Sequence, residues 1–161
     1  MKKLNAILLL PFIAFLQFCS NGNSFDFKNH AIDEIQYSYH DASVPPHLQR
    51  NYTIIVKPDI VSVLTNFHDT TFSCTKEKFN NIIDLLETSK LRSDTSAHND
   101  GCPGGDGESL SCSSKGNLVF SGEINYCGNK RSGSLKGNIE PVATAILKLI
   151  PDMDKLLDNG Q

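Results

Sequence analysis

The chain has 161 residues, of which 39% are hydrophobic and 20% are charged, and its formal net charge is −3. Beyond the first 18 residues about 140 remain, which is enough for one domain with a core of its own. The chain has neither a positive net charge nor a basic run, so the electrostatic footprint of a nucleic-acid-binding protein is missing and we expect no such partner.

The first nineteen residues have the layout of a secretory leader. Two lysines follow Met1, a largely apolar run extends over residues 6–18, and Cys19 comes next. The run is shorter than the roughly 20 apolar residues that a bilayer-spanning helix needs. A charged start followed by a short apolar core is typical of a signal peptide. We therefore predict a signal peptide over residues 1–18 and an exported protein.

The end of the leader, Leu16-Gln17-Phe18-Cys19, resembles the lipobox of bacterial lipoproteins. The resemblance covers only the leader. It implies that a lipid is attached to the Cys19 thiol and anchors the protein to a membrane of the bacterial cell envelope, on the periplasmic or the surface face. A plain signal peptide cut nearby is the alternative. We expect residues 19–30 to form a polar tether and residues 31–161 a single domain.

Five cysteines are present, an odd number that would leave one unpaired thiol in an oxidising compartment. If Cys19 carries the lipid, four remain for two disulfides, as expected after export. None has the C-x-x-C spacing of a zinc or redox site. Among three possible connectivities we favour Cys102–Cys127 and, by elimination, Cys74–Cys112.

The first half of the body predicts strands. Period-two alternation and β-branched runs indicate strands over residues 35–40, 52–57 and 60–67. Pro58-Asp59 is a favourable centre for a tight turn between the last two. In a two-residue loop Val56 faces Val61 and Ile54 faces Val63, so both pairs lie on one face of the sheet.

The second half predicts two helices that flank a hairpin. Helical spacing of apolar residues indicates helices over 75–89 and 139–157, the second kinked or restarted at Pro151. Between them, strands are expected over 109–113 and 118–126. Pairing Leu110 with Phe120 and Cys112 with Leu118 requires a three-residue turn that contains Gly116.

The predicted order is therefore β-β-β-α-β-β-α. The simplest packing is one antiparallel sheet with both helices on one face, an α+β fold that disulfides staple. The opposite face would present Ile55 and Leu64 among polar side chains, which makes it a candidate binding surface. The loop that contains Pro45 and Pro46 is a second candidate.

The glycine-rich loop over residues 92–108 carries Asp100, Asp106 and Glu108, whose oxygens could bind a cation such as calcium. Their spacing is not that of an EF-hand, and a structural loop is the simpler interpretation, so we expect neither a metal nor a cofactor. We also find no G-x-S-x-G elbow, so no catalytic residue is predicted.

These observations favour a non-enzymatic role. We expect a small binding module that meets a protein, a peptide or an envelope polymer, in addition to the membrane that holds its lipid. The alternative is a small hydrolase or metal-dependent enzyme with its site in the 92–108 loop. Such an enzyme would bring His98 or His68 within hydrogen-bond reach of Asp100 or Glu108.

Overall fold

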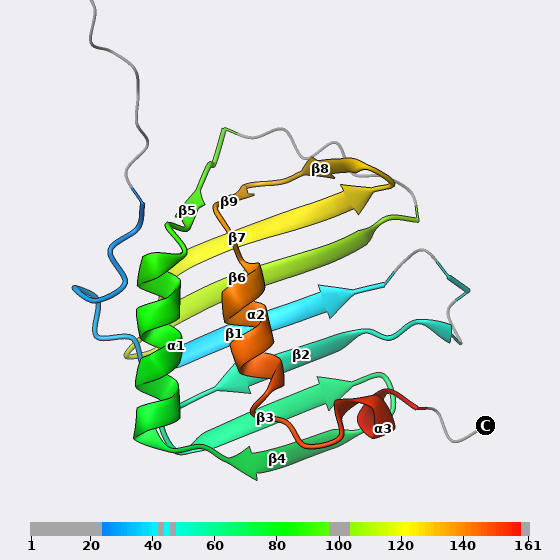
Figure 1. Ribbon diagram of the computed structural model, residues 1–161, viewed down its shortest axis with the longest axis horizontal. Coiled ribbons are helices and arrows are strands. Elements are labelled where there is room, and N and C mark those ends of the chain that lie inside the picture. Colours follow the sequence, from blue (N-terminus) through cyan, green and yellow to red (C-terminus); the bar gives the residue numbers. More distant parts are fainter. Residues whose placement is uncertain (1–23, 42–43, 46–47, 97–103, 159–161) are drawn as a thin grey trace, which may run out of the picture.

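The computed structural model describes residues 24–41, 44–45, 48–96 and 104–158. Within these residues, seven antiparallel strands form one sheet in the order β4-β3-β2-β1-β6-β7-β8, and β5 pairs with β9. The helices lie on one face of the sheet (Figure 1). The fold is thus α+β and rich in strands. The bounds are β1 Glu34–His40, β2 Tyr52–Val56, β3 Ile60–Thr65, β4 Asp69–Ser73, α1 Lys76–Thr88, β5 Arg92–Ser93, β6 Asp106–Ser114, β7 Asn117–Cys127, β8 Lys130–Ser132, β9 Leu135–Lys136, α2 Glu140–Leu147 and α3 Met153–Leu157.

The first predicted hairpin has the expected register. Val56 lies opposite Val61 and Ile54 opposite Val63, and all four side chains are fully buried. The alternation within β2 and β3 directs these residues towards the helices, because side chains two residues apart share a face of a strand. β4 was not predicted, since its sequence Asp-Thr-Thr-Phe-Ser is polar and only Phe72 packs against the core.

Helix α1 begins where the sequence indicates. The Thr75 hydroxyl accepts a hydrogen bond from the Lys78 N–H at 3.3 Å and caps the helix, whose buried face carries Phe79, Ile82 and Leu86. The predicted C-terminal helix is divided into α2 and α3. Helix α2 ends before Pro151, and α3 begins after Asp152, which adopts a positive φ of 53°.

The predicted register of the second hairpin is wrong. Cys112 lies opposite Phe120 and not opposite Leu118, and the turn has two residues instead of three. Lys115 and Gly116 both adopt positive φ (51° and 76°), as a two-residue hairpin turn of type I′ requires. A register shift follows Cys112, and it leaves one extra residue of β7 without a partner, as in a β-bulge.

The expectation of a disulfide-stapled fold is also wrong. Cys74 and Cys112 are buried free thiols. Phe72, which is close to Cys74, lies at the same level of the sheet as Cys112, but four strand-to-strand steps away. These steps amount to roughly 19 Å. The Cα atoms of a disulfide lie within about 7 Å of each other, so Cys74 and Cys112 are too far apart to form one. Cys127 is not among these free thiols, but Cys102 lies outside the described residues, so that pair stays a prediction.

The N-terminal segment packs further into the domain than a tether would. Phe27 is fully buried, and its ring centroid lies 4.8 Å from that of Phe25 and 4.9 Å from that of Phe120. Its backbone N–H donates to Glu87 Oε2 at 2.9 Å. The folded domain therefore includes residues 24–30, which the sequence had suggested would belong to the tether.

Candidate functional site

All four tyrosines of the chain gather on the helix-covered face of the sheet, towards one end of its strands. Tyr37 and Tyr39 share this face because they are two residues apart in β1. Tyr52 lies opposite Tyr39, with ring centroids 5.5 Å apart, and 6.1 Å from Tyr37. Tyr126 reaches the same region from β7.

Glu108 lies at the centre of these tyrosines. It is directly opposite Tyr39, across the β1–β6 pair. The Tyr37 hydroxyl donates to Glu108 Oε2 at 3.1 Å, and the Tyr126 hydroxyl donates to Oε1 at 3.0 Å. Both oxygens of one half-buried carboxylate are therefore held by aromatic hydroxyls, which fixes the orientation of the group.

Asp106 adds a second carboxylate beside the first. It precedes Glu108 by two residues on the same face and lies opposite Tyr126. Its Oδ1 atom is buried and has no hydrogen-bond partner among the described residues. Leaving a buried acceptor unsatisfied costs roughly 1–3 kcal/mol, so this atom is expected to gain from a donor.

The electrostatics keep the tyrosines in their hydrogen-donating form. Burial raises the pKa of Tyr37, Tyr52 and Tyr126 above the ordinary tyrosine value, and the neighbouring Glu108 carboxylate raises it further. Burial and then Asp106 raise the pKa of Tyr39 to about 12. A phenol with a raised pKa is a hydrogen-bond donor near neutral pH and a poor candidate for a base.

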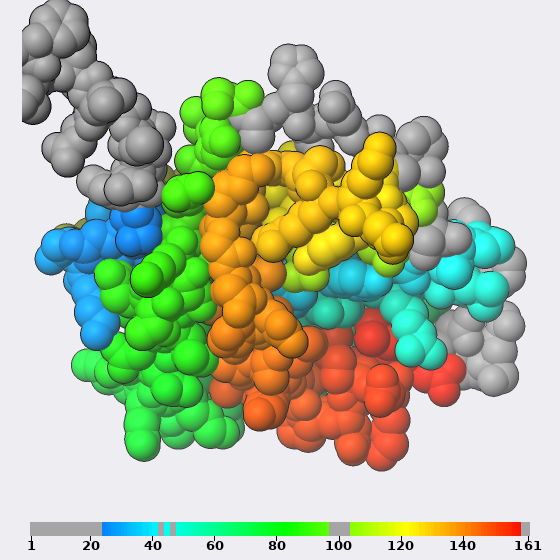
Figure 2. All heavy atoms as spheres, turned by 45° about the horizontal axis from the view of Figure 1, so that its top comes forward, coloured from blue at the N-terminus to red at the C-terminus, as the bar shows by residue number. Residues whose placement is uncertain are grey.

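A cavity of about 340 Å³ opens beside Glu108. Its lining combines apolar side chains of α2 with polar groups, and consists of Tyr37, Glu108, Tyr126, Arg131, Asn138, Ile139, Glu140, Ala143, Thr144 and Leu147. In Figure 2, α2 (orange) and the turn between β7 and β8 (yellow) border this part of the surface. The volume is at the lower end of the range for small-ligand sites.

Two of the predicted ligand residues meet in this site. Asp106 and Glu108 were expected in a loop, but they belong to β6 and project towards the tyrosines. Asp100 and His98 lie outside the described residues. Within the described ranges, no group of three or more His, Cys, Asp or Glu side chains could hold a metal ion.

His68 does not approach Glu108. It is exposed in the turn after β3, where its backbone carbonyl accepts from the Thr65 N–H. Thr65 is three strand steps from Glu108, through Tyr52 and Tyr39, which corresponds to roughly 14 Å. These two side chains therefore do not form the acid–base pair that the enzymatic alternative requires.

The other predicted binding surface is only weakly apolar. Ile55 is half-buried and Leu64 is 39% exposed, on the face of the sheet opposite the helices. Around them lie hydroxyl groups, such as those of Ser38 and Thr53, which hydrogen-bond to each other at 3.0 Å. Pro45 is exposed, and Pro46 lies outside the described residues.

The tyrosine cluster was missed because its parts are far apart in sequence. Tyr37 and Tyr39 suggest ordinary cross-strand packing, and Glu108 looked like the end of a glycine-rich loop. The usable signal was the same two-residue spacing in Asp106 and Glu108, which continues into Leu110 and Cys112 and indicates that β6 begins earlier.

Comparisons with known proteins do not extend this description. No protein-family model, curated protein or solved structure matches the chain. None of the helices in the described ranges is long and apolar enough to cross a membrane.

Proposed function

We propose that the chain is an exported, lipid-anchored binding module of the bacterial cell envelope, and that the cavity beside Glu108 is its ligand site. The leader and Cys19 support the location. The observation that carries the site is the cluster of four tyrosines around Glu108 and Asp106, of which Tyr37, Tyr126 and Glu108 line an open cavity.

The chemistry of the cavity favours a ligand that donates hydrogen bonds and carries positive charge. Glu108 and Glu140 line it, and Asp106 supplies an unsatisfied oxygen nearby. The ion pairs found among the described residues do not involve these three carboxylates. The one cationic side chain in the lining, Arg131, donates to the Gly137 carbonyl oxygen at 3.2 Å.

An ammonium or guanidinium group would therefore find both charge and aromatic surface. Carboxylates form strong charge-assisted hydrogen bonds with such groups, and tyrosine faces attract cations. The size of the cavity suits one lysine-like or arginine-like side chain of a peptide, or one amino-sugar unit of a polymer. The raised tyrosine pKa values and the position of His68 support binding rather than catalysis.

The test is a thermal-shift and calorimetric titration of the purified protein with four probes. These are acetyl-lysinamide, acetyl-argininamide, glucosamine and, as the uncharged probe, N-acetylglucosamine. A ligand present at 100 times its Kd stabilises the folded state by about 2.7 kcal/mol, which a melting curve resolves. We expect at least one cationic probe to bind and the uncharged probe to fail.

The variant Glu108→Gln keeps the shape of the side chain and removes its charge. We expect it to weaken binding of the cationic probe at least tenfold, whereas the matched control Glu77→Gln, on the exposed side of α1, leaves binding unchanged. Equal affinities in Glu108→Gln and the unaltered protein, or no response to any of the cationic probes, would contradict the assignment of this cavity.

A further inference from the structure

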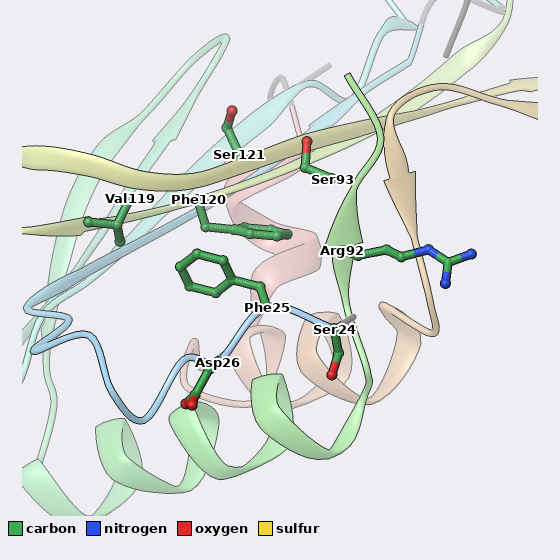
Figure 3. A pocket seen from close by; sticks show the side chains of 8 residues that line it. All are labelled: Ser24, Phe25, Asp26, Arg92, Ser93, Val119, Phe120 and Ser121. Atoms are coloured by element: carbon green, nitrogen blue, oxygen red, sulfur yellow. The ribbon is translucent and has the colours of Figure 1, made fainter. Parts of the chain in front are cut away.

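The point at which the folded domain meets its N-terminal extension is fixed. The Phe25 N–H donates to the Leu91 carbonyl oxygen at 2.8 Å, and the Phe25 ring contacts Phe120 with centroids 5.1 Å apart. Figure 3 shows the two rings next to each other, one from the N-terminal segment and one from β7, and their planes are tilted by 53°. Ser24, the first residue that the structure describes, is therefore held at this place on the domain.

A shallow hollow of about 500 Å³ marks this place. It is lined by residues 24–26, 92–93 and 119–121, which we call the N-terminal edge. The adjoining β6–β7 hairpin carries exposed Lys115 in its turn and exposed Leu118 near the start of β7. Leu118 is 64% exposed, more than any other large hydrophobic side chain described. On the edge itself the exposed side chains include the Arg92 guanidinium and the Asp26 carboxylate.

The distance from this edge to the proposed lipid is short. Four residues lie between Cys19 and Ser24, so five residue steps connect them. Even fully extended, five residues span at most about 17 Å. The 11 residues of β7 alone extend over roughly 37 Å. A lipid on Cys19 therefore keeps the N-terminal edge near the membrane, because the connection is shorter than the domain.

We infer that the N-terminal edge faces the membrane and rests against anionic lipid headgroups, and that the cavity beside Glu108 opens further from the lipid surface. The inference depends on the proposed lipid at Cys19. Arg92 and Lys115 provide positive charge for the headgroups, and Leu118 provides an apolar contact at their level. Tyr126 at the cavity is six residues beyond Phe120 along β7, or about 20 Å.

Two single-cysteine labels test this orientation in the full lipidated protein. Asn117→Cys places a dye beside the N-terminal edge, and Asn66→Cys places one in the turn between β3 and β4, about 24 Å further along the strands. Both positions are exposed. The native thiols Cys74 and Cys112 are buried, and parallel labelling of the protein without an introduced cysteine measures the dye that the native cysteines take up.

The protein is bound to vesicles of phosphatidylethanolamine and phosphatidylglycerol that contain a headgroup energy acceptor. We expect transfer from position 117 to be at least twice that from position 66. Replacing phosphatidylglycerol with neutral phosphatidylcholine should reduce this ratio, since the basic side chains lose their attraction.

The outcomes separate the two proposals. If the protein floats with the vesicles but both dyes transfer equally, or position 66 transfers more, the orientation is wrong while the anchor stands. A ratio that persists in neutral vesicles overturns the headgroup contact. If the protein does not float with vesicles at all, the lipid anchor fails and the orientation fails with it, whatever the cationic probes show at Glu108.

Discussion

Replacing Phe27 with alanine tests whether the N-terminal segment belongs to the folded domain. The Phe27 side chain is fully buried and lies between Phe25 and Phe120. Removing roughly 150 Å² of buried aromatic surface at about 25 cal/mol per Å² costs about 4 kcal/mol. This agrees with the 3–5 kcal/mol that phenylalanine-to-alanine changes typically cost in protein cores.

The assay is urea unfolding followed by far-UV circular dichroism, because the chain contains no tryptophan. We expect Phe27→Ala to lower the unfolding free energy by about 4 kcal/mol and the melting temperature by roughly 12–16 °C. The control is Phe67→Ala, whose side chain is 42% exposed in the turn after β3. It should cost about 1 kcal/mol or less.

A cost for Phe27→Ala no greater than that for Phe67→Ala would refute the reasoning. It would mean that residues 24–30 contribute nothing to the core and act as a tether. The geometric basis of the orientation on the membrane would then be lost as well, because the chain would leave the domain after residue 30 and the connection to Cys19 would be more than twice as long.

Three further predictions concern the backbone, pH and thiols. Gly133→Ala should destabilise the protein by more than 3 kcal/mol in urea unfolding, because Gly133 has a φ of 114° and a Cβ there would lie 2.3 Å from a backbone oxygen. In the control Gly128→Ala, at a φ of 56°, the added Cβ meets no atom within 4 Å, so this change should cost about 1 kcal/mol. Between about pH 10 and pH 12 the unfolding free energy should fall as pH rises. The reason is that the folded protein holds the Tyr39 proton up to about pH 12, whereas the unfolded chain releases it near pH 10. An unfolding free energy that stays constant across this window would contradict the raised pKa of Tyr39. At pH 8 iodoacetamide should leave Cys74 and Cys112 unmodified until urea unfolds the protein, because burial raises the pKa of both thiols, that of Cys112 to about 12. Mass spectrometry of the native protein measures this, and alkylation of either thiol before unfolding would contradict the prediction.

The sequence predicts those parts of the fold in which local pattern and tertiary packing agree. The hairpin around Pro58-Asp59 is such a case, because alternation and turn length specify the same register. The helix that Thr75 caps is another. In both, the information lies within about fifteen residues, so a single sequence is sufficient.

The predicted strand register was wrong where two turn lengths fitted the local sequence about equally well. Around Lys115-Gly116, a two-residue and a three-residue turn both place apolar side chains on one face. The outcome depends on an extra residue accommodated as a bulge in β7, which alternation cannot indicate. The disulfide between Cys74 and Cys112 failed for a different reason, because it depends on the order of strands in the sheet, and β1 lies between β2 and β6.

The candidate site was the least predictable part. It joins Tyr37 and Tyr39 of β1 to Glu108 of β6, about seventy positions away, and each looks ordinary in its own segment. Their convergence follows from the pairing of β1 with β6. The sequence shows which residue types could form such a site, but it does not predict that they lie together in the fold.

The same pairing has a consequence for how the molecule is made. β1 precedes the other described strands in the chain, but one of its two neighbours in the sheet is β6. Ile35 can therefore pair with Cys112 only after the intervening residues have been synthesised. The contact between Phe27 and Phe120 likewise forms only after the intervening residues have been synthesised. Such distant partners favour slow folding, on the scale of milliseconds to seconds, because long loops must close first. Under the export proposed above, this slow folding would keep the chain unfolded until most of its length had crossed the membrane.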